Sequence, residues 1–189
     1  MNGVEKFQWK QTVITLAVAL SIALTVNWAV LQGFGQTSAD RAEHSLVGIL
    51  LLMAYIALCA DPHASPLRAV GFFCVALVPC YLGTVFPDLD ITLLGIGGHR
   101  NPLFHSSLSF FLLWLSVRLG VKQPKAVIHT LVAGYGIGLA SHLWWDVLYY
   151  GDVRWLPGSV IDRVWLGVHG LLCLTAAGTG VLRSHRAGV

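Results

Sequence analysis

The chain has 189 residues, of which 56% are hydrophobic and only 11% charged, and its mean hydropathy is +0.69. This composition excludes an ordinary soluble domain and is typical of a small polytopic membrane protein. The net charge of +3 is spread over short loops and forms no basic face, so we expect no nucleic-acid partner. Membrane lipid is the expected surrounding of the chain.

Six apolar stretches are each close to the roughly 20 residues that a helix needs to cross a bilayer core. In chain order they are 11–31, 43–60, 66–85, 104–119, 126–149 and 165–182. Lys6 and Lys10 precede the first, but its apolar run is too long for a signal peptide, so we expect a retained anchor. The predicted fold class is an all-α transmembrane bundle of about six spans, formed by a single integral membrane domain over residues 1–189.

Lysine and arginine placement predicts the orientation of these spans. With the N-terminus inside, the inner side receives eight of these residues and the outer side four, so the positive-inside rule favours N-in and C-in. This orientation puts His44 at the outer start of the second span. It also puts Asp88 and Asp90 at the outer end of the third span and His105 at the outer start of the fourth. These polar residues are therefore expected in one leaflet.

Carboxylates and histidines gather at the ends of the spans in three short segments. They are 86–90 (FPDLD), 98–106 (GHRNPLFHS) and 141–146 (SHLWWD). Charged groups inside or at the edge of a membrane are costly, so such a pattern indicates a function. His142 and Asp146 are four residues apart, which puts both on one helical face.

A divalent metal suits this set of side chains, because imidazole nitrogen with carboxylate oxygen is typical of zinc, and also of manganese or iron. Zinc is the expected cofactor, and haem is a poor match for so many aspartates. The expected metal ligands are Asp88, Asp90, His105, His142 and His44. The candidate catalytic residues are Arg100, which could contact an anionic group, His99, and Asp146, which either binds metal or orients His142.

Each of these residues also has a purely structural interpretation. The aspartates of segment 88–90 could end a helix in a turn, and His105 could belong to a helix cap. His142 with Asp146 could form a polar clasp between helices. His169, in the sixth span, could be a ligand, a proton relay or a satisfied intramembrane polar contact.

The motifs resemble the YdjM-like family of LexA-regulated, inner-membrane-associated metal-dependent hydrolases. Its members carry a histidine before a small apolar helix, then LPDID, GHRGxTHS and GxxSHxxxD; the counterparts here lie in 43–48 (EHSLVG), 87–90, 98–106 and 138–146. The resemblance covers about residues 43–158, with the first span as an addition. The chain differs by one extra residue between His99 and His105 and by Ile91, where many members have histidine.

The resemblance implies a metal-dependent hydrolase in the bacterial inner membrane, and the orientation predicted from the lysines and arginines puts its site on the outer side. A metal ion activates water for attack on an ester or phosphoester, so we expect a substrate of that kind, lipid-linked and reached through the membrane. The alternative is a non-catalytic accessory or assembly subunit of a larger membrane complex, which keeps the polar cluster as a structural clasp. In that case the partners are the subunits of the complex.

Overall fold

The computed structural model describes residues 25, 39–59, 66–121, 126–148 and 156–187. These residues form helices joined by turns, with no strand among them. The elements are α2 (Ala39–Cys59), α3 (Pro66–Val85), α4 (Leu89–Leu94), the 3-10 helix η1 (Ile96–Gly98), α5 (Leu108–Gly120), α6 (Ala126–Leu148) and α7 (Ser159–Ala187). The predicted all-α fold class is confirmed.

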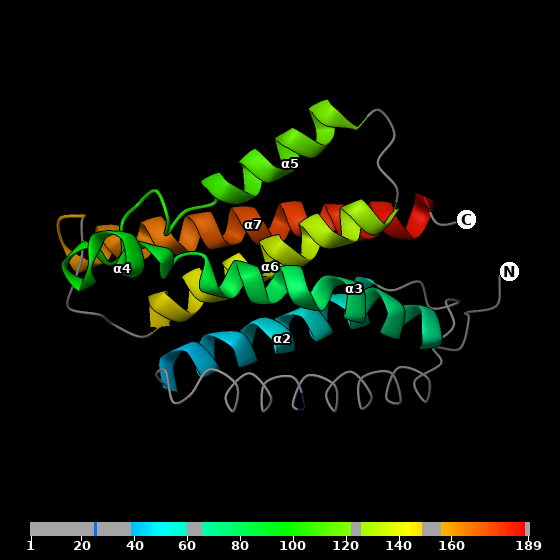
Figure 1. Cartoon of the computed structure of the whole chain (residues 1–189), viewed down its shortest axis with the longest axis horizontal. Coiled ribbons are helices and arrows are strands. Elements are labelled where there is room, and N and C mark those ends of the chain that lie inside the picture. The colour runs from blue at the N-terminus through cyan, green and yellow to red at the C-terminus, as the bar shows by residue number, and fades with distance from the viewer. Residues whose placement is uncertain (1–24, 26–38, 60–65, 122–125, 149–155, 188–189) are drawn as a thin grey trace, which may run out of the picture.

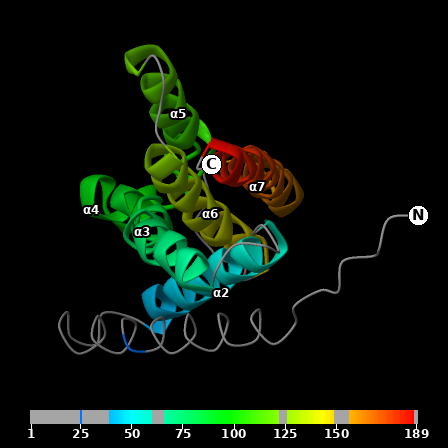
Figure 2. The ribbon, with the colours of Figure 1, turned by 90° about the vertical axis from the view of Figure 1, so that its right-hand side faces the viewer.

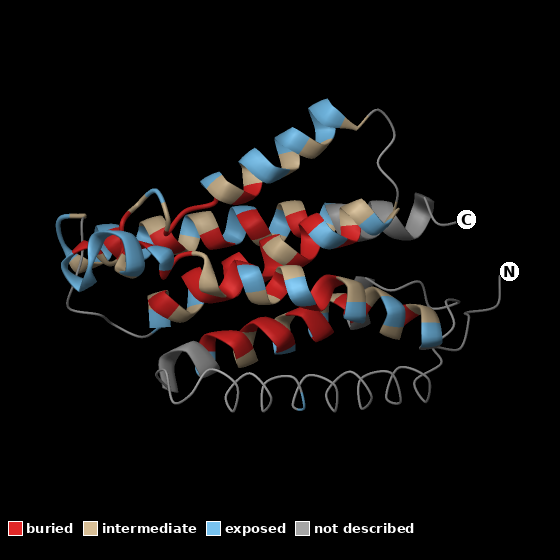
Figure 3. Ribbon diagram, viewed as in Figure 1, coloured by how far each residue is buried: buried red, intermediate tan, exposed pale blue. Residues whose placement is uncertain are grey.

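Helix α6 is the centre of the bundle. It packs against α2, α3, α5 and α7, and the end-on view shows these helices arranged around it (Figure 2). Nearly every residue of α6 from Val132 to Leu143 is buried, and the buried residues of α2, α3 and α7 face it (Figure 3). Side chains carried by α6 toward its C-terminal end therefore lie inside the protein.

Helices α3 and α6 approach backbone to backbone at two glycines. A Cβ atom on Gly138 would collide with the carbonyl group of Cys80, and one on Gly83 would collide with the carbonyl oxygen of Tyr135. Small residues permit this close helix contact in membrane proteins. The contact matters for function because it fixes α3 and α6, which both carry polar residues a short distance further toward one end of the bundle.

We predict that Gly138→Ala lowers the free energy of unfolding by about 3 kcal/mol, the upper part of the usual range for overpacking. Gly71→Ala is the matched control, because nothing lies within 4 Å of a Cβ at that position on α3. Thermal unfolding of the two variants in detergent measures the difference. Equal melting temperatures for both variants would contradict the backbone contact between α3 and α6.

Three helical segments are long and apolar enough to cross a membrane: Leu67–Val85, Ala126–Leu148 and Ser159–Thr179. Two others, Glu43–Ile56 and Leu108–Gly120, are apolar but shorter. Helix α5 has 13 residues, about 20 Å in length against a hydrocarbon core of about 30 Å. The structure therefore supports three of the six expected spans by this criterion, and the first expected span falls outside the described residues except for Thr25. The inward orientation of both termini stays a prediction.

One end of the bundle collects the chain segments that carry the polar motifs. The start of α2, the end of α3, the end of α6 and the start of α7 lie there together (Figure 1). The short helices α4 and η1, which the sequence did not predict, cover the same end. Residues 101–107 form turns and bends before α5, so this helix begins four residues later than expected and leaves His105 in an irregular segment.

Candidate metal centre

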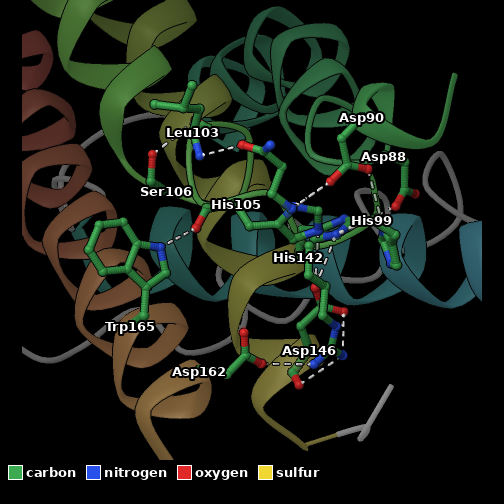
Figure 4. Close-up of polar contacts among 12 residues, drawn as sticks. Asp88, Asp90, His99, Leu103, His105, Ser106, His142, Asp146, Asp162 and Trp165 are labelled. Carbon is green, nitrogen blue, oxygen red and sulfur yellow. Dashed lines mark hydrogen bonds and ion pairs between the residues drawn. The ribbon is translucent and has the colours of Figure 1, made fainter. Parts of the chain in front are cut away.

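Polar side chains from several segments meet at this end of the bundle, and Figure 4 shows most of them pointing toward one another. The structure brings together every residue predicted for the site: His44, Asp88, Asp90, His99, Arg100, His105, His142 and Asp146. All of them except the half-buried His99 are buried. The cluster therefore lies in the interior of the protein, away from solvent.

Three ligand atoms at the centre of the cluster face one another without hydrogen bonds. The Nε2 atoms of His105 and His142 lie 3.4 and 3.5 Å from Oδ2 of Asp146. All three atoms are buried, and none has a hydrogen-bond partner among the described residues. Buried polar atoms normally have partners. In tetrahedral zinc sites with bonds of 2.0–2.2 Å, neighbouring ligand atoms are about 3.3–3.6 Å apart, so both distances to Asp146 match those between ligands of one divalent ion.

Two further residues extend this centre. Nε2 of His44 lies 3.8 Å from Oδ1 of Asp146, and Oδ1 of Asp88 lies 3.8 Å from Nε2 of His142. The imidazole rings of His44 and His142 are stacked, with centroids 3.9 Å apart and planes inclined by 11°. Two imidazole rings from different helices thus lie side by side in the cluster, and neutral imidazole is a common metal ligand.

The backbone of α3 selects the free nitrogen of His142. Nδ1 of His142 donates a hydrogen bond of 2.7 Å to the carbonyl oxygen of Thr84. This contact uses Nδ1 as the protonated nitrogen and leaves the lone pair on Nε2, the atom that faces Asp146. Thr84 lies close to the C-terminal end of α3, where its carbonyl is available because α3 ends one residue later, at Val85.

Asp90 holds two other histidines of the cluster. Its Oδ1 and Oδ2 lie 3.1 Å from Nδ1 of His99 and Nδ1 of His105, and Oδ2 accepts a hydrogen bond of 2.9 Å from the backbone N–H of Asn101. Both oxygens are therefore engaged, as in carboxylates that orient metal-binding histidines. The sequence predicted Asp90 as a ligand and left Asp146 as a ligand or an orienting group. The geometry suits Asp146 as the ligand and Asp90 as the group that orients histidines.

The contacts of Asp90 also set its charge. Burial raises the pKa of this carboxyl, but its contacts with His105, His99 and the Asn101 backbone outweigh burial and hold the pKa below its ordinary value of 3.8. Because folding lowers the pKa of Asp90, the ionised carboxylate stabilises the folded chain at any pH above the ordinary pKa of 3.8. That contribution is lost as the pH falls through the lowered pKa.

The capping interpretations can be compared with the contacts directly. Asp88 occupies the N-cap position of α4 but makes no side-chain capping hydrogen bond, and its carboxylate instead faces His142. Near the start of α5, Oγ of Ser106 accepts a hydrogen bond of 3.3 Å from the backbone N–H of Leu108. The N-cap residue of α5 itself is Ser107, which makes no side-chain capping hydrogen bond. The His105 ring takes no part in the cap and lies in the cluster.

His169 lies outside the cluster and has a structural contact. Its Nδ1 accepts a hydrogen bond of 3.2 Å from the backbone N–H of Ser107 and lies 2.8 Å from the Ser107 hydroxyl. Its neighbour Trp165 donates a hydrogen bond of 2.9 Å to the carbonyl oxygen of His105. Helix α7 thus fastens the segment that carries His105 through these two side chains.

Arg100 connects the cluster to α7 through a residue that the sequence analysis missed. Its Nη1 lies 3.2 Å from Oδ2 of Asp162. Its Nη2 lies 3.3 Å from the carbonyl oxygen of Asp146 and 3.6 Å from Oδ1 of the same residue. Arg100 has a φ of 60°, the only positive φ of a non-glycine residue in the described part of the chain, a conformation that costs on the order of 1–3 kcal/mol. The guanidinium is therefore held in place against strain, and it positions Asp146.

We predict that Asp162→Leu lowers the free energy of unfolding by about 3 kcal/mol, because it removes one partner of a buried ion pair. The double variant Arg100→Met with Asp162→Leu should recover part of this loss, since no unpaired charge then remains at that position. Arg163→Gln, at the exposed next position on α7, is the control. Denaturant unfolding of the wild type and the three variants measures the effect. An unchanged stability in Asp162→Leu would contradict the buried ion pair between Arg100 and Asp162.

A comparison of the chain with models of protein families, with curated proteins and with solved structures found no match. The resemblance to the YdjM-like family therefore stays a prediction. The geometry establishes that buried histidines and aspartates of the cluster could hold a metal ion.

Proposed function

We propose that the chain is an integral membrane hydrolase that depends on a divalent metal ion, zinc first, and acts on a phosphoester or ester of a lipid-linked substrate. The observation that carries the proposal is the set of buried ligand atoms without hydrogen bonds, contributed by His105, His142 and Asp146. Side chains that only clasp helices together would be expected to hydrogen-bond to one another.

The chain's own residues have distinct parts in this proposal. His105, His142 and Asp146 hold the ion, while Asp90 and the carbonyl of Thr84 keep the imidazole rings in the correct orientation. A bound zinc ion supplies Lewis-acid activation of water and of the ester oxygen. Arg100 adds a buried positive charge beside Asp146, where it favours an anionic substrate.

Apolar side chains beside the cluster support a substrate with a hydrocarbon chain. Leu93, Leu94 and Ile96 are 67%, 50% and 65% exposed, and they belong to α4 and η1, the same short segment that carries Asp90 and leads to His99. In a membrane protein such side chains face lipid. A lipid headgroup could then approach the ion while its acyl chains stay beside α4. The inner membrane and the outer leaflet are the proposed location, on the basis of the resemblance and the lysine and arginine distribution.

The test is turnover in phospholipid vesicles that contain the purified, zinc-loaded protein and phosphatidic acid, with release of inorganic phosphate as the measured quantity. Asp88 borders the proposed ion, because its Oδ1 lies 3.8 Å from Nε2 of His142. Asp88→Ala is therefore expected to reduce turnover about 100-fold, the order of effect of removing a group next to a metal ligand. Glu43→Gln removes an exposed carboxylate of α2 at the same end of the bundle and should leave turnover unchanged. Equal turnover in Asp88→Ala and wild type would contradict the proposal.

One feature favours the alternative, an accessory subunit of a membrane complex. Helix α5 diverges from the rest of the bundle (Figure 1) and exposes Leu112, Leu115 and Leu119. If the metal-loaded protein shows no turnover of phosphoesters or carboxylic esters, and Asp88→Ala lowers only stability, this second function replaces the first.

A further inference from the structure

We propose that the cluster binds two divalent ions, held by two adjoining sets of ligands with Asp146 at the boundary between them. The first set is His44, His142 and Asp146; the second is Asp88, His99 and His105. Within each set, one ligand atom from each residue lies within 4.8 Å of the others. This inference deepens the proposed function and rests on it.

The two sets adjoin each other through short distances. Nε2 of His142 in the first set lies 3.8 Å from Oδ1 of Asp88 in the second, and Oδ2 of Asp146 lies 3.4 Å from Nε2 of His105. Oδ1 of Asp146 approaches His44 of the first set. Oδ2 lies between the two sets, because it is also 3.5 Å from Nε2 of His142. Paired ions in two-metal sites are about 3.5–4 Å apart, and a carboxylate at the boundary is the group that can contact both.

The number of donors exceeds what one ion uses. A catalytic zinc ion takes three protein ligands, and a structural zinc ion takes four, whereas the two sets together offer six residues. A single ion would leave at least two of these donors outside its coordination shell. Five of the six are buried, so the interior gathers more metal-ligating side chains than one zinc ion coordinates.

The charge of the cluster also favours a second ion. The cluster and its contact with α7 contain four buried carboxylates and one buried guanidinium: Asp88, Asp90, Asp146, Asp162 and Arg100. With neutral histidines the net charge is −3, one divalent ion leaves −1, and two leave +1. Unbalanced negative charge in an interior is costly and would repel an anionic substrate, whereas a small positive charge would attract it.

A two-ion site narrows the substrate class. Pairs of metal ions occur in phosphatases and nucleases, where they stabilise the attacking and leaving oxygens of a phosphoryl centre. The inference therefore favours phosphoesters over carboxylic esters. The chain contributes to such a reaction by fixing the spacing of the two ligand sets. Helix α6 and the turns around α4 and η1 hold this spacing.

Elemental analysis of protein purified in detergent and equilibrated with zinc tests this directly. We expect two zinc ions per wild-type chain and one in each of His44→Ala and His99→Ala, whose residues belong to different sets. His129→Ala, in the first turn of α6 and far along the helix from His142, should retain two. Because either variant could fail to fold, electron paramagnetic resonance of wild-type protein with two equivalents of Mn²⁺ gives a second readout, a spin-coupled signal.

The outcomes separate the two proposals. One zinc ion in the wild type, with an uncoupled manganese signal, would overturn the two-ion inference and leave a single-metal hydrolase intact. No bound metal in the wild type would overturn both proposals.

Discussion

Asp146→Asn is expected to abolish the stabilisation that zinc gives to the folded chain. The amide would turn either its nitrogen or a weaker oxygen donor toward His105 and His142, whose Nε2 atoms lie 3.4 and 3.5 Å from Oδ2 in the wild type. A ligand present at 1,000 times its dissociation constant stabilises the state that binds it by about 4 kcal/mol. The wild type should show a gain of that order on addition of zinc, and Asp146→Asn should show none.

The measurement is the melting temperature in detergent, with a chelator and with excess zinc. Asparagine preserves the shape of the side chain, so the melting temperature in chelator shows whether the variant folds. Glu43→Gln is the matched control, since it removes an exposed carboxylate from the same end of the bundle, and it should respond to zinc as the wild type does. A zinc-dependent gain that survives in Asp146→Asn would exclude Asp146 as a ligand.

Asp90→Asn is expected to weaken zinc binding by about 10- to 100-fold, the usual effect of removing a group that orients metal-binding histidines. An asparagine has one acceptor oxygen and one donor nitrogen, so at these two positions it can accept a hydrogen bond from His99 or from His105 but not from both. One ring therefore loses its orientation. The number of ions bound at saturation should stay unchanged, which separates this variant from Asp146→Asn.

Competition with a fluorescent zinc chelator measures the affinity change of Asp90→Asn. Thr92→Ala serves as the control, because Thr92 lies two residues further along α4 and is exposed, so its affinity should equal that of the wild type. Loss of bound zinc at saturation in Asp90→Asn would make Asp90 a direct ligand, as the sequence alone predicted.

Much of the fold could be predicted from hydropathy. The predicted range 66–85 coincides with α3, and 126–149 differs from α6 by one residue. The prediction was less accurate at 104–119, because hydropathy does not register that residues 101–107 turn to carry His105 inward. It also missed the start of α7 at Ser159, six residues before the apolar run at 165.

That earlier start explains why Asp162 was missed. In the sequence it is one acidic residue among the loop charges beside Arg163, and nothing marks it as buried. In the structure it lies in the first turn of α7, facing Arg100. Its role depends on a contact 62 residues away in the chain, which only the packing of the helices reveals.

The site residues were predictable because charge inside an apolar chain is costly and therefore informative. The separate role of each residue could not be predicted from the sequence. Asp88 and Asp90 look alike in the sequence, two residues apart after Pro87, yet the first faces His142 and the second accepts from Asn101 and contacts two histidines. That difference follows from the turn between α3 and α4, which points the two carboxylates in different directions.

The measurement that tests the metal site most directly is X-ray absorption at the zinc edge of the loaded protein. The account predicts only nitrogen and oxygen neighbours at about 2.0–2.2 Å, with the outer-shell scattering of imidazole rings, and a changed spectrum in His142→Ala. A sulfur neighbour at about 2.3 Å would assign the zinc to cysteine and contradict the site. Absence of bound zinc from the wild-type protein would contradict it equally.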